Sequence, residues 1–225
     1  MKTKNKSALQ LLYCTFTCGL FLGTLIYVAL SASHVGLTPT SRLMLLQSTL
    51  GIISALLPLL LSRVLGWHIP SLMLALYELF LILSIFLGEI ILLYERVSFF
   101  DDIMHLGSAA LLATLGYSLI APSKGLTPKQ TSMYIVAFAL SVGVFWELFE
   151  FTADGILGLN MQRFLSAEGM PLVGRAALSD TMQDLIVDLT GAASVGALYS
   201  IGQRFGFYPL SALKIEFGKN SNHNI

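Results

Sequence analysis

Charged residues are scarce in this sequence. Asp, Glu, Lys and Arg make up 12% of the 225 residues, whereas hydrophobic residues make up 55%. This charge fraction is about half of that in an ordinary soluble domain, and it argues against a soluble protein. The formal net charge is zero, and no basic stripe or interleaving of basic and aromatic residues is present. A nucleic-acid partner is therefore excluded from the functions considered.

Cysteine is also rare. The two cysteines, Cys14 and Cys18, lie one helical turn apart in the first apolar run, where we interpret them as small apolar residues rather than metal ligands or a disulfide. The chain has no linker rich in Pro, Gly or Ser, no low-complexity tract and no clear internal repeat. We therefore expect residues 1–225 to form a single membrane domain.

Long hydrophobic runs are what the sequence has in place of charge. Runs of about 20 apolar residues are long enough to cross a hydrocarbon core about 30 Å thick. They predict an all-α, polytopic bundle of about six spans in a lipid bilayer, with an outer loop over residues 153–180. The predicted spans are residues 8–31, 43–61, 71–94, 102–121, 130–152 and 181–202. Pro58 predicts a kink or an early end in the second of them.

The basic residues predict the orientation of these spans. Nine of the 13 Lys and Arg residues fall on the N-terminal side of the membrane, so the positive-inside rule places both termini in the cytoplasm. The first run follows "MKTKNK" and ends near "SAS", which is compatible with a cleaved signal peptide. Its apolar part is longer than usual for such a peptide, which favours an uncleaved anchor.

The acidic residues have the opposite distribution. Eleven of the 13 Asp and Glu residues fall in the outer half of the membrane or outside it. The fourth span begins with "FDDIMH", which can bring Asp101 and Asp102 onto the face of His105. The fifth ends with "FWELFEFTAD", which contains Glu147 and Glu150. The sixth begins with "SDTMQDLIVDL", whose aspartates Asp180, Asp184 and Asp188 descend through about 12 Å of depth and so cannot all serve one point.

Carboxylates inside the hydrocarbon edge need a compensating partner, because an ionised Asp at a helix centre costs on the order of 3 kcal/mol. Many carboxylates with a single imidazole suit a divalent cation, namely Mg²⁺, Mn²⁺ or Zn²⁺. A di-iron centre is disfavoured because the Glu-x-x-His pairs of such sites are missing. The predicted metal ligands are Asp101, Asp102, His105, Glu147, Glu150, Asp180, Asp184 and Asp188. His105, Glu147 and Glu150 are also the candidate catalytic residues, and Arg163 and Arg175 the candidate substrate-binding residues.

Simpler interpretations stay open for these residues. Asp180 can cap the last helix in a capping box with Gln183, and Asp101 or Asp102 can cap the fourth. His105 can be an ordinary buried histidine. A structural salt-bridge network with Arg163 and Arg175 can instead account for four of the carboxylates, namely Glu147, Glu150, Asp184 and Asp188. Glu78 stands alone in the third span, where it can pair with a tyrosine or a cytoplasmic base.

The three acidic motifs, "FDDIMH", "FWELFEFTAD" with "GLNMQR", and "SDTMQDLIVDLTGA", occur in an order that resembles the YjdF-like family of bacterial inner-membrane proteins. More distantly the order is similar to that of VanZ-like proteins. The closer resemblance covers about residues 70–202. It implies a multi-pass protein of the bacterial inner membrane and points to the same acidic positions, but it implies no particular reaction.

Three functions compete on the sequence. The first is a metal-dependent, hydrolase-like enzyme acting at the outer face on a lipid-linked or envelope substrate such as a phosphate ester or a glycolipid. The second is a cation- or proton-coupled transporter, although no repeat or midplane site is visible. The third is a non-catalytic scaffold that binds a structural cation. No nucleophile motif or phosphatase signature is present, and the sequence does not indicate the oligomeric state.

Overall fold

The computed structural model describes residues 2–123, 125–166 and 168–218, and these residues are almost entirely helical. Six helices are long and apolar enough to span a membrane, which confirms the predicted number of spans. They are Ser7–His34, Thr40–Val64, Ser71–Ile90, Phe100–Ile120, Pro128–Leu157 and Gly174–Phe205. The chain divides into two compact units, one comprising residues 1–100 and 211–225 and the other Asp101–Leu210.

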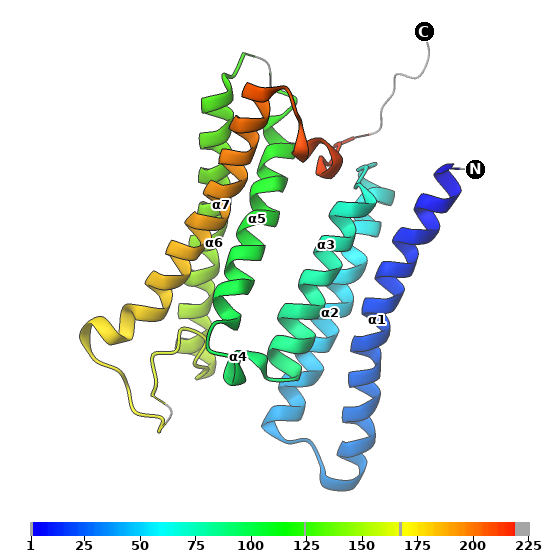
Figure 1. Ribbon diagram of the computed structural model, residues 1–225. Coiled ribbons are helices and arrows are strands. Elements are labelled where there is room, and N and C mark those ends of the chain that lie inside the picture. Colours follow the sequence, from blue (N-terminus) through cyan, green and yellow to red (C-terminus); the bar gives the residue numbers. More distant parts are fainter. Residues whose placement is uncertain (1, 124, 167, 219–225) are drawn as a thin grey trace. The chain divides into compact units, whose positions relative to one another are not determined.

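The first unit consists of α1 (Lys2–Val35), α2 (Pro39–Val64), α3 (Ser71–Leu81) with its continuation η1 (Ile82–Ile90), and the short α4 (Leu93–Arg96). Helices α1, α2 and α3 pack on one another side by side (Figure 1). The segment after Ser211 returns to this unit, where the backbones of His68 and Glu216 form an antiparallel bridge. The rings of Trp67 and Phe217 meet edge to face beside it, with their centroids 4.8 Å apart.

The second unit consists of α5 (Phe100–Ile120), α6 (Pro128–Leu157), η2 (Gly174–Leu178), α7 (Ser179–Phe205) and η3 (Pro209–Leu213). Small residues allow its three long helices to approach closely. A Cβ on Gly191 of α7 would lie 2.6 Å from the carbonyl oxygen of Leu106 on α5, and one on Gly116 of α5 would meet Phe138 of α6. The apolar core of this unit contains Ala113, Ile135, Ala139, Ala192, Val195 and Leu210.

Helix ends differ from the sequence prediction where local backbone chemistry decides them. Pro39, expected as a break, occupies the first turn of α2, where its missing N–H costs nothing. Pro58 does not end α2, which continues to Val64. The third span ends at Ile90 rather than at residue 94, because it closes as a π-helix and Leu92 then takes a left-handed conformation with φ 65°.

The connection between the last two spans is shorter than predicted. Helix α6 continues past residue 152 to Leu157 and ends at Gly158, which takes the left-handed conformation (φ 65°) that glycine adopts without strain. Residues 174–178 already form the helical turn η2 ahead of α7. The true connection is therefore 158–173, within which Ala167 lies outside the described residues. Lys124 and Lys219, two of the residues behind the predicted orientation, also lie outside them.

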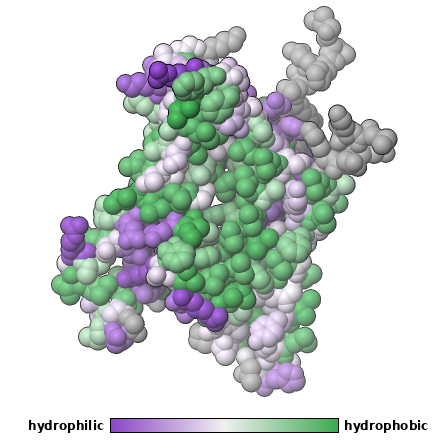
Figure 2. All heavy atoms as spheres, viewed as in Figure 1, coloured by the Kyte–Doolittle hydropathy of each residue, from purple (hydrophilic) through white to green (hydrophobic). Residues whose placement is uncertain are grey.

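Hydrophobic residues cover much of the visible helix surface, as expected of a protein surrounded by lipid (Figure 2). Large apolar side chains such as Phe145, Phe149 and Phe151 on α6 are exposed. A hydrophilic patch interrupts this surface at the end of the second unit where α5 begins and α6 ends (Figure 2). The acidic motifs belong to this end of the unit.

Candidate metal centre

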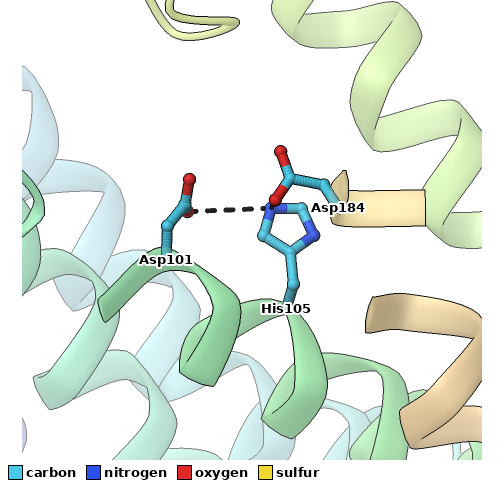
Figure 3. A group of neighbouring side chains, drawn as sticks. All are labelled: Asp101, His105 and Asp184. Carbon is cyan, nitrogen blue, oxygen red and sulfur yellow. Dashed lines mark ion pairs between the residues drawn. The ribbon is translucent and has the colours of Figure 1, made fainter. Parts of the chain in front are cut away.

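The first turns of α5 and α7 bring one imidazole and two carboxylates together. Asp101 and His105 are four residues apart on α5, so both point to the same side, and Asp184 faces them from α7 (Figure 3). His105 Nε2 lies 3.8 Å from Asp101 Oδ1 and 3.9 Å from Asp184 Oδ1. One ligand atom from each of the three residues lies within 4.8 Å of the others. We call Asp101, His105 and Asp184 the central trio.

The two distances from His105 Nε2 to the carboxylates of the central trio are close to those of a metal site. Bonds of about 2.1 Å in tetrahedral geometry put ligand atoms about 3.4 Å apart. The observed distances from Nε2 are a few tenths of an ångström longer, a difference that carboxylate rotation can close. The donors, one nitrogen and two carboxylate oxygens, are those that Zn²⁺ and Mn²⁺ accept.

Asp188 lies on the other side of the same imidazole. Its Oδ1 is 3.2 Å from His105 Nδ1, and its side chain is buried. The three aspartates of α7 therefore meet different partners, as their descent along the helix predicts. Asp184 faces Nε2, Asp188 faces Nδ1, and Asp180 faces an arginine.

That arginine is Arg163, which comes from the connection between α6 and η2. Its Nη2 lies 3.2 Å from Asp101 Oδ2, and its Nη1 lies 3.4 Å from Asp180 Oδ1. Arg163 thus holds the oxygen of Asp101 that faces away from His105. The salt-bridge alternative expected arginine partners for the carboxylates deeper in the membrane, whereas the ion pairs of Arg163 are with Asp101 and Asp180. Arg175 is exposed and forms no ion pair within the described part of the chain.

Hydrogen bonds within the connection between α6 and η2 hold the backbone that carries Arg163. Asp154, the last residue of "FWELFEFTAD", accepts hydrogen bonds from the main-chain N–H groups of Met161 and Gln162, at 2.8 and 3.0 Å. Asn160 accepts another from Leu165 N–H. These bonds fix the backbone around Arg163, which has a positive φ of 45°. Further along, Ser166 donates to exposed Glu168, which lowers the pKa of that carboxyl from its usual value.

Glu147 is buried at 4% exposure, and neither of its carboxylate oxygens makes a hydrogen bond among the described residues, although the side chains of Gln162 and Thr181 lie near enough to interact with them. It is close enough to His105 and Asp180 to interact with both electrostatically. The nearby side chain of Gln162 donates instead to the main-chain oxygen of Glu147 and to Thr181 Oγ1. A buried carboxylate without a donor is costly unless a cation accompanies it. Sequence reasoning missed Gln162, because no periodic pattern marks a single loop amide.

The remaining predicted ligands are placed differently. Glu150 is buried and close enough to Glu147, His105 and Asp101 to interact with them electrostatically, but forms no ion pair with His105. Asp102 Oδ1 accepts a hydrogen bond of 2.7 Å from Gln183 Nε2, and Asp102 forms no ion pair with His105. The predicted capping box of Asp180 and Gln183 is therefore wrong, since Gln183 reaches α5 and α7 has no side-chain cap. Asp101 and Asp102 lie within the first turn of α5 rather than at a cap position.

Comparison with known proteins gives a family but no reaction. Residues 7–204 match the family described as "Predicted membrane protein (DUF2238)". A curated protein of Thermotoga maritima, named "Uncharacterized protein", is 30% identical over 115 residues, which are 50% of this chain and 53% of that protein. The chain thus spans about half the length of this relative. No solved structure matches the chain. Since the family match includes all three acidic motifs, the chain belongs to the DUF2238 family of predicted membrane proteins.

Proposed function

We propose that the second unit binds a divalent cation at Asp101, His105 and Asp184, and that this cation serves a hydrolase-like reaction on a lipid-linked or envelope substrate. The observation that carries the proposal is the buried carboxylate of Glu147, whose oxygens make no hydrogen bond among the described residues and which lies close enough to His105 to interact with it electrostatically. Six carboxylates lie around the guanidinium of Arg163 and the imidazole of His105. They are those of Asp101, Glu147, Glu150, Asp180, Asp184 and Asp188. The imbalance favours a further positive charge.

The donor set narrows the choice of cation. One imidazole nitrogen and two carboxylate oxygens fit Zn²⁺ or Mn²⁺, whereas Mg²⁺ prefers oxygen alone. When bound, such a cation supplies Lewis-acid polarisation of a phosphoryl or carbonyl oxygen and acidifies a bound water. The surrounding residues must then orient the substrate and move the proton.

Residues of this chain suit both tasks. In hydrolysis of a phosphate ester, the water oxygen bonds to phosphorus, the ester P–O bond breaks, and the leaving alcohol takes up a proton. Glu147 can accept the proton of the attacking water, because its oxygens make no hydrogen bond within the part of the chain that the structure describes. Arg163 uses two of its five N–H donors on Asp101 and Asp180, which leaves others for an anionic group of the substrate. Arg175 remains a second candidate for that contact.

The proposal also includes the membrane in which the protein lies and the face at which the site opens. The YjdF-like resemblance and the distribution of basic residues support an inner-membrane protein whose acidic site opens at the outer face. A lipid phosphate or glycolipid of the outer leaflet would reach such a site without crossing the membrane. This location distinguishes the proposed enzyme from a cytoplasmic hydrolase.

One observation favours a second candidate, a structural role for the cluster. Arg163 already joins Asp101 to Asp180, as a salt-bridge network requires. A scaffold held together in this way needs no substrate. Held by ion pairs alone, such a scaffold predicts that substitutions of the central trio lower stability without changing metal content. A scaffold that binds a structural cation would lose the metal as the enzyme does, and would differ from it by releasing no phosphate.

Metal analysis of the detergent-purified protein separates these functions. We expect about one Zn²⁺ or Mn²⁺ per chain in the wild type, and its loss in Asp184→Ala and in His105→Ala. Asp102→Ala is the matched control, because Asp102 pairs with Gln183 and should keep the metal. Equal metal content in all four proteins would reject the metal centre. Release of inorganic phosphate from vesicles containing phosphatidic acid then tests one substrate class.

A further inference from the structure

The two nitrogens of His105 face different carboxylates. Nδ1 lies 3.2 Å from Asp188 Oδ1, whereas Nε2 faces Asp101 and Asp184 at 3.8 and 3.9 Å. An ionised carboxylate only accepts hydrogen bonds, so Nδ1 carries the hydrogen in the shorter contact. This arrangement directs Nε2 toward the central trio.

The second carboxylate oxygen of Asp188, Oδ2, packs against α6 at Gly143. A Cβ at this position would overlap with Oδ2. Glycine is unfavourable in a helix interior, and α6 has no turn or break at this residue. The bare backbone at Gly143 is therefore the space that the buried carboxylate of Asp188 needs.

We propose that Asp188 is a positioning residue rather than a metal ligand, and that Gly143 provides the space for its carboxylate. Asp188 accepts the Nδ1–H of His105 and fixes the ring, so that Nε2 points between Asp101 and Asp184. Carboxylates that hold the far nitrogen of a metal-binding histidine commonly change metal affinity by 10–100-fold. The consequence for metal binding rests on the function proposed above, whereas the hydrogen bond of Asp188 to His105 and its contact with Gly143 do not.

The hydrogen bond can be tested without metal. In histidine ¹⁵N-labelled protein in detergent, we expect a slowly exchanging Nδ1–H signal that disappears in His105→Gln. The signal should survive in Asp188→Asn, whose amide oxygen still accepts, and vanish in Asp188→Ala. Gly143→Ala should abolish it as well, whereas Gly155→Ala on the same helix should not, because a Cβ there meets nothing within 4 Å. A signal that persists in Asp188→Ala, or in Gly143→Ala, would overturn the proposal.

The consequence for metal is measured by titrating Zn²⁺ or Mn²⁺ into the same variants. Asp188→Ala and Gly143→Ala should weaken binding by about 10–100-fold, and Asp188→Asn by clearly less. If Asp188→Asn binds as weakly as Asp188→Ala, the charge of Asp188 acts as a ligand and the positioning role is rejected. If the wild type binds neither cation while the Nδ1–H pattern holds, the metal centre fails and the positioning of His105 stands.

Discussion

The two units of this protein bury acidic residues in different ways. In the described part of the first unit, the buried acid is Glu78, whose Oε1 accepts a hydrogen bond from Cys14 Sγ at 3.2 Å while its Oε2 makes no hydrogen bond among the described residues. In the second unit the buried acids are Glu147, Glu150, Asp154, Asp184 and Asp188. A single carboxyl that accepts a hydrogen bond from a neutral donor is compatible with ordinary helix packing in a membrane. A gathering of carboxylates around one imidazole is what the proposed cation would offset, so the comparison favours packing in the first unit and, under the proposed function, chemistry in the second.

The largest expected effect comes from a glycine substitution that separates helices in one unit only. Gly191→Ala would place a Cβ 2.6 Å from the carbonyl oxygen of Leu106, the residue after His105. We expect a loss of about 3 kcal/mol in the free energy of unfolding, measured by SDS titration in mixed micelles, because backbone atoms cannot move aside cheaply. Gly23→Ala on α1 is the control, since a Cβ there meets nothing within 4 Å. Equal stability of the two variants would show that the approach of α5 and α7 is not tight.

A second prediction compares the buried glutamates. Without divalent cation, Glu147→Gln should raise the free energy of unfolding by about 2 kcal/mol, because it removes a buried charge that lacks a donor. Glu78→Gln should have a smaller effect, since the amide oxygen still accepts from Cys14. Addition of Zn²⁺ or Mn²⁺ should stabilise the wild type more than Glu147→Gln. A cation-free Glu147→Gln protein that is less stable than the wild type would contradict the assigned charge imbalance.

The spans could be predicted from the sequence because each is a long apolar run, and length alone decides whether a helix can cross the bilayer. Their ends could not, because they depend on single backbone conformations. Leu92 takes a left-handed conformation after η1, and Gly158 ends α6 beyond the predicted limit. Neither residue breaks the hydrophobic pattern strongly enough to be identified from it.

The candidate site, like the spans, could be predicted from the sequence only in part. Spacing of four residues placed Asp101 beside His105, and the descent of the α7 aspartates indicated that they meet different partners. The rotation of each helix decides which oxygen faces which nitrogen, and no sequence pattern encodes it. Gly143 was missed for that reason, although a glycine inside a helix next to an acidic motif is a usable signal.

A third prediction concerns the arginines. Arg163→Gln should lower the free energy of unfolding by about 1 kcal/mol, because it leaves Asp101 and Asp180 without their partner at a partly exposed place. Arg175→Gln should have no measurable effect, since Arg175 is exposed. The difference between the two variants should shrink at high salt, which screens exposed charges. Similar losses in both would mean that the ion pairs of Arg163 do not stabilise the second unit.

The smallest effect tests the packing role of the first unit. Cys14→Ala removes the donor to Glu78 and should lower the free energy of unfolding by about 0.6 kcal/mol, the usual size of a hydrogen bond between membrane helices. Cys18→Ala, one turn away on α1, removes a similar volume without that bond and should cost less. Both variants should keep the metal content of the wild type, because their polar contacts belong to the first unit. A cysteine variant that loses metal would break the assignment of chemistry to the second unit alone.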